Sequence, residues 1–180
     1  MTEYALLIDG ALREIRQYDE KPQDIPHKKV SWHPVVRDEG PTAFTGLENG
    51  NWVVRTALPT LEELRAQKLA ELAALRWDRE TGGTVFNGMP VATDAVSQTK
   101  YIGAVVGAQI DPLAVINWKM ADGTFVALVA QAITAVAMAV RAHVQACFDN
   151  EAVLKAEIEA ASTAEEIAAV ELNTGWPLVE

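Results

Sequence analysis

The sequence predicts an α+β protein in which a small N-terminal β module is joined by an amphipathic helix to a mainly helical C-terminal domain with one or two β-hairpins. Three observations predict this class. Turn signals separate short alternating segments in the first third of the chain, and capped helical periodicities follow. Apolar residues make up 49% of the 180 residues, enough for a buried core. We expect boundaries at 1–58, 59–82 and 83–180.

The first 58 residues have the pattern of short strands and turns. The alternation from Tyr4 to Ile8 ends at Asp9-Gly10, a common hairpin turn. Four prolines between residues 21 and 41 exclude a helix there, and an edge strand is expected from Val30 to Val36. Asn49-Gly50 signals another turn, so this part is predicted to be a small β module.

The segment 59–82 is expected to be an amphipathic helix that connects the two parts. Thr60 and Glu63 have the spacing of a capping box, the helix should run to about Arg79, and Gly82-Gly83 should stop it. At about 100° per residue, its leucines gather on one side. These leucines are Leu61, Leu64, Leu72 and Leu75.

The C-terminal part alternates hairpin signals with helical patterns. Asn87-Gly88 between apolar flanks predicts a hairpin. A helix is expected from Asp94, its N-cap candidate, to Asp111. Asp122-Gly123 predicts a second hairpin or tight turn, and a long apolar stripe predicts a helix from Leu128 to Phe148.

Beyond that helix two alternatives stay open. Asp149-Asn150 either breaks the helix or begins a second one in which Val153, Leu154 and Ile158 contact the core. A last short helix is predicted after Ser162 or Thr163, with a glutamate completing the capping box.

Charge and composition exclude several classes of partner. The formal net charge is −10, which disfavours duplex nucleic acid and anionic membrane surfaces. The N-terminus has no signal-peptide pattern, and the longest apolar run, Phe125 to Val140, contains Gln131 and Thr134. We therefore expect a soluble protein that binds neither nucleic acid nor membrane.

Two pairs of residues could form a functional site, and packing of their side chains is the alternative interpretation for each pair. His143 and Cys147 are four residues apart, so on a helix they adjoin, as half of a metal site or a Cys–His pair would. No third ligand is evident, and free cysteine often packs as a small hydrophobe. His27 and His33 lie in the proline-rich segment without a metal-ligand spacing. Packing is favoured for both pairs, so we expect no catalytic residue, cofactor or metal.

Other features indicate contacts between surfaces. Gly103 and Gly107 form a small-xxx-small pattern, which suggests close packing of helices within the domain or between subunits. Tryptophan is enriched at interfaces, although packing within the chain is at least as good an interpretation. The residues predicted as a possible interface are Trp32, Trp52, Leu61, Leu64, Leu72, Leu75 and Trp77.

Several spaced motifs resemble a domain family of unknown biochemical activity that occurs in proteins of tailed bacteriophages and prophages. The resemblance covers roughly residues 62–178, and residues 32–35 and 50–52 look like the short β modules that precede this domain. The motifs lie at residues 77–83, 87–91, 93–94, 97–98, 115–119, 121–123 and 139–148. The family is typically encoded beside tail-fibre or baseplate genes, and it supplies no catalytic residues.

The resemblance implies a virion protein of the phage tail, made in the bacterial cytoplasm. We expect a non-enzymatic adaptor of the tail tip, baseplate or fibre attachment that packs against other tail proteins and forms a homo-oligomer. The alternative is a chaperone that assists tail-fibre assembly. A metal-binding protein or enzyme using His143, Cys147 and the loop histidines His27 and His33 is the third hypothesis.

Overall fold

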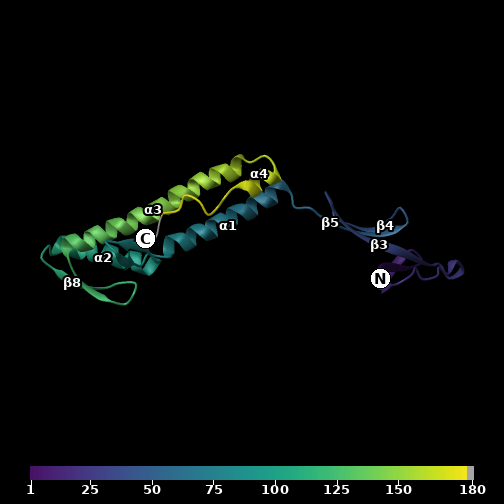
Figure 1. Cartoon of the computed structure of the whole chain (residues 1–180), viewed down its shortest axis with the longest axis horizontal. Coiled ribbons are helices and arrows are strands. Elements are labelled where there is room, and N and C mark those ends of the chain that lie inside the picture. Colours follow the sequence, from purple (N-terminus) through teal and green to yellow (C-terminus); the bar gives the residue numbers. More distant parts are fainter. Residues whose placement is uncertain (178–180) are drawn as a thin grey trace. The chain divides into compact units, whose positions relative to one another are not determined.

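The computed structural model describes residues 1–177 and divides the chain into two compact units, Met1–Thr60 and Leu61–Glu180. The first unit is a β-sheet and the second is mainly helical with two hairpins (Figure 1). The chain is therefore an α+β protein, as its sequence predicts.

The first unit contains one mixed five-stranded sheet in the order β2-β1-β3-β5-β4. Its elements are β1 (Thr2–Ile8), β2 (Ala11–Tyr18), the 3-10 turn η1 (Pro26–Lys28), β3 (Val30–Gly40), β4 (Phe44–Glu48) and β5 (Asn51–Ala57). Both predicted turns form hairpins: Asp9 and Gly10 have φ of 52° and 77°, and Asn49 and Gly50 have 50° and 80°. Positive φ at both central residues is what a type I′ turn requires.

The prediction of an edge strand around Val30 is wrong, because β3 lies in the middle of the sheet. Residues Val30 to Pro34 pair antiparallel with β1, whereas Val35 to Gly40 pair parallel with β5. Pro34 therefore stands where the strand changes partners, and each half of β3 has only one of these two neighbours. The missing N–H of the proline is tolerated at this junction, which the sequence pattern alone does not reveal.

The second unit is built on two long helices that run alongside each other (Figure 1). The segment expected as a connector is packed along α3 within this unit, because its leucine side is covered there. The elements are α1 (Leu61–Thr81), β6 (Thr84–Phe86), β7 (Met89–Val91), α2 (Ala95–Ile110), β8 (Val115–Lys119), β9 (Phe125–Val129), α3 (Ala130–Ala160) and α4 (Ala164–Ala169). Asp94 caps α2 and Thr163 caps α4, as predicted.

Helix α3 continues through Asp149-Asn150 without a break, which settles the alternative left open by the sequence. Leu154 and Ile158 extend its buried stripe and pack with Leu72 of α1 and with Trp176. Continuous burial along one side explains why the helix extends to Ala160.

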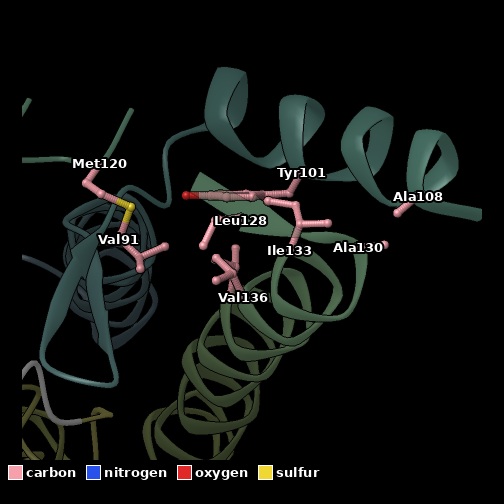
Figure 2. Close-up of a cluster of buried hydrophobic side chains, with 9 residues drawn as sticks. Val91, Tyr101, Ala108, Met120, Leu128, Ala130, Ile133 and Val136 are labelled. Atoms are coloured by element: carbon pink, nitrogen blue, oxygen red, sulfur yellow. The ribbon is translucent and has the colours of Figure 1, made fainter. Parts of the chain in front are cut away.

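Two apolar clusters hold the second unit together. One joins α1 to the C-terminal half of α3, and the other joins α2 and both hairpins to its N-terminal half. In the latter, Figure 2 shows Tyr101 and Ala108 on the side of α2 that faces α3, near Ile133. The Tyr101 ring also stacks on Trp118 of β8, with ring centroids 4.8 Å apart. No helix within residues 1–177 is long and apolar enough to cross a bilayer.

Candidate functional site

The most polar part of the interior lies where the C-terminal end of α1 meets α3. Arg76 forms an ion pair with Glu80 one turn away, and its Nε lies 3.3 Å from a carboxylate oxygen of Glu151 on α3. The guanidinium also lies over the ring of Phe148, 4.8 Å from the centroid. These charged side chains are mostly buried, so each depends on the others for its stabilisation.

His143 and Cys147 belong to this region and are both buried. The Nε2 atom of His143 donates a hydrogen bond to the carbonyl oxygen of Arg79 at 3.0 Å, since a carbonyl can only accept. The Cys147 Sγ atom lies 3.8 Å from that same nitrogen. The proton of the ring therefore stands on the nitrogen nearest the thiol, where a general base would need a lone pair.

The electrostatics of Cys147 also disagree with an activated nucleophile. Burial is the main cause that raises the pKa of its thiol, whereas reactive cysteines have a lowered pKa. His143 acts instead on the end of α1, where the last carbonyl groups lack partners within the helix. Thr93 helps in the same way, because its hydroxyl donates to the carbonyl oxygen of Glu80 at 2.5 Å. The arrangement is a structural joint between helices.

The loop histidines do not converge on a ligand site either. His33 contacts the carbonyl oxygen of Gly50 and the hydroxyl of Ser31, each at 2.9 Å, and His27 lies exposed on η1. Within residues 1–177, no three side chains of His, Cys, Asp or Glu are grouped closely enough to hold a metal ion.

The surface that stands out is an apolar groove between α2 and α3, with a volume of about 360 Å³. Its walls are formed by Ile102, Val105 and Val106 from α2 and by Ala137, Met138 and Val144 from α3. Several of these side chains are largely exposed, among them Ile102 at 67% and Met138 at 57%. A contiguous exposed apolar surface of this kind is typical of a protein–protein contact.

The groove is also the least charged part of the second unit. Residues 95–110 and 125–148 contain no carboxylate side chain, and their only Lys and Arg residues are Lys100 and Arg141. The rest of the chain carries all 25 acidic residues. The region can thus bind apolar surface without burying a carboxylate, and Arg141 is the charged side chain that lines the groove.

Most residues predicted as an interface are packed inside their own unit. Trp32, Trp52 and Leu72 are buried, and the Trp32 ring meets Tyr18 edge-on at 5.3 Å. Leu61, Leu64 and Leu75 are half-buried, whereas Trp77 is 52% exposed. Trp77 is therefore the residue of the predicted set with the largest exposed fraction, and the one best placed to contact a partner.

The groove face of α2 was missed at the sequence level, although a signal was present. Only one of the 16 residues in α2, Lys100, carries a charge. A helix that is apolar all round is normally covered all round. The pattern Gly103-xxx-Gly107 pointed to the right helix, but within residues 1–177 no atom lies within 4 Å of a Cβ added at either glycine.

Comparison with known families identifies one match. The model of a domain of unknown function, DUF4376, matches residues 63–171, more than half of the chain. The matched range runs from the start of α1 to just beyond α4 and includes the groove. No curated protein and no solved structure matches the chain.

Proposed function

This chain belongs to the DUF4376 family of domains of unknown function, and we propose that it is a structural adaptor of a bacteriophage tail. It acts by packing against other proteins at the tail tip, the baseplate or the fibre attachment. The virion tail is its place of action, and it reaches the tail after synthesis in the bacterial cytoplasm.

The observation that carries the adaptor role is the exposed apolar groove between α2 and α3. The hydrophobic effect stabilises contacts that remove such surface from water, by about 25 cal/mol per Å². The two compact units support the same role, because each has its own core and so offers a separate surface. The tail itself is proposed on the resemblance of residues 62–178 to a phage domain family.

Mass spectrometry of purified particles from the phage or prophage that encodes this chain tests the proposal. We expect peptides of the chain in mature particles at a fixed ratio to the tail proteins. Crosslinks should map to the two helices that form the groove, for example to the exposed Lys100 of α2.

The matched variants are Val106→Glu, on the groove wall, and Ala70→Glu, on the exposed side of α1. Only the first should lower incorporation into particles. Absence of the chain from mature particles would contradict the tail role. If the chain is absent from particles and the tail-fibre protein encoded beside it is soluble only when the two are co-expressed, the chain is an assembly chaperone instead.

A further inference from the structure

We propose that the outward face of α2 pairs with α2 of a second copy of this chain, about a two-fold axis near Gly103. The inference rests on the proposed function in one respect only, namely that this apolar face is an interface. It adds the identity of the occupant and the geometry of the contact.

Both sides of α2 carry large apolar side chains, although only one side is covered by other parts of residues 1–177. Tyr101 and Ala108 are buried on the side that faces α3 (Figure 2). The opposite side is exposed to solvent, and its large side chains are Val96 at 62%, Ile102 at 67%, Val106 at 48% and Ile110 at 80% exposure. Contact with another apolar surface would remove these side chains from water, which is favourable.

The exposed side chains have the spacing of a helix–helix seam. Val96, Gly103 and Ile110 are seven residues apart, with Thr99 and Val106 between them. This 3.5-residue repeat is the pattern that keeps one stripe of a helix against a partner helix. The seam therefore fits another α-helix better than a strand or a small molecule.

The shape of the seam is complementary to itself. A Cβ atom added at Gly103 or Gly107 would meet nothing within 4 Å, so both glycines present bare backbone to solvent. If two copies cross near Gly103, the backbones can approach closely there and diverge towards the ends. In an antiparallel pair, Val96 of one copy then lies against Ile110 of the other, where the wider gap accommodates both side chains.

Charge favours a second copy over a contact made elsewhere on the chain. Two copies that each carry a net charge of −10 repel one another, so they can meet best where carboxylates are absent. Residues 95–110 meet that condition, with Lys100 as their only charge. The seam itself is neutral, and the nearest carboxylates in the sequence, Asp94 and Asp111, lie just beyond its two ends.

The exposed area also has the right order of magnitude. A fully exposed aliphatic side chain presents on the order of 100 Å². The four large side chains above supply roughly a third of the about 800 Å² that each partner buries in a standard interface. The backbone at the two glycines and the groove walls add to this.

The test is sedimentation velocity of the full 180-residue chain over a concentration series, with the matched variants Val106→Glu and Ala70→Glu. We expect a reversible monomer–dimer equilibrium. Val106→Glu should raise the dimer Kd at least about tenfold, because it places two carboxylates in the seam. Ala70→Glu adds the same charge on α1 and should leave the Kd within about twofold.

A second variant keeps the test decisive if Val106→Glu fails to fold. Gly103→Ala should raise the Tm of the monomer, since alanine is the better helix former and its Cβ meets nothing. The same methyl group should weaken the dimer severalfold by separating the two backbones. A more stable monomer together with a weaker dimer is expected only if Gly103 lies in the contact.

Three results would overturn the pairing: a monomer at millimolar concentration, a dimer whose Kd does not respond to either seam variant, or a larger assembly in place of a dimer. A monomeric chain that is present in particles would refute the pairing and leave the tail role intact. If the chain forms a dimer that Val106→Glu dissociates but is absent from particles, the pairing is supported and the tail role is refuted.

Discussion

Helices α1 and α2 both pack on α3, yet their outward sides differ completely. Nine of the 21 residues of α1 are charged, whereas α2 has one charged residue in 16. Helix α1 buries Leu72 and presents charged side chains and alanines to solvent. Helix α2 buries Tyr101 and presents Ile102, Val106 and Ile110.

The difference shows that two helices can pack on the same neighbour and still have outward faces suited to different surroundings, water in one case and a partner protein in the other. Helix α1 needs no contacts beyond those with α3 and α4, because its remaining charged side is well solvated by water. Helix α2 exposes Val96, Ile102, Val106 and Ile110, and an exposed apolar surface of this kind is typical of a contact with a partner.

The largest effect is expected where α1 and α3 share buried charge. Arg76→Ala should lower the free energy of unfolding by about 4 kcal/mol, because Glu80 and Glu151 lose their cation in a mostly buried site. Urea denaturation followed by circular dichroism measures this. Arg76→Met combined with Glu80→Leu should recover part of the loss, since no unpaired charge is left at position 80 while Glu151 still lacks its cation. A loss below about 1 kcal/mol in the single variant would mean that the ion pair is dispensable.

Leu72→Ala tests the apolar contact of the same helix. Leu72 is 1% exposed and packs with Cys147 and Ile158, so its truncation should cost about 3 kcal/mol through lost burial and a cavity. Urea denaturation should show a lower midpoint at an unchanged slope. An unchanged midpoint would contradict the packing of α1 on α3.

The cap of α2 is expected to have a smaller effect that depends on pH. The Asp94 carboxylate accepts hydrogen bonds from the Ser97 hydroxyl and from the N–H groups of Val96 and Ser97. The Ser97 hydroxyl is the main cause that lowers the pKa of Asp94 below 3.8. Asp94→Ala should cost about 1 kcal/mol at pH 7.

The sign of this pH dependence follows from the lowered pKa. The ionised carboxylate stabilises the fold fully above the ordinary pKa near 3.8, and this contribution is lost as the pH falls through the lower value in the folded state. The cost of Asp94→Ala should therefore shrink below about pH 4. Asp94→Asn keeps a capping oxygen without titrating, so its stability relative to Asp94→Ala should vary less with pH.

The smallest effect is expected on the outward face of α2. Ile102→Ala should change the stability of the monomer by no more than about 0.5 kcal/mol, because 67% of the side chain is already exposed. The comparison with Leu72→Ala is sharpest at a concentration low enough for the monomer to predominate. A loss as large as that of Leu72→Ala would show that Ile102 is already covered within the chain.

Sequence patterns correctly predict the elements whose formation depends on neighbouring residues. Turn glycines after Asp9, Asn49 and Asn87 form hairpins, and Asp94 and Thr163 cap the helices that follow them. These features were predictable because the partners in each turn or cap lie within four residues of one another.

Which surfaces are covered depends instead on the tertiary structure. It placed β3 inside the sheet and brought Arg76 to Glu151 across 75 residues of chain. It also buried Trp32, Trp52 and Leu72, which the sequence had suggested as an interface, and left the apolar side of α2 open. Burial is a sum over contacts between segments far apart in the chain, so no local pattern contains it.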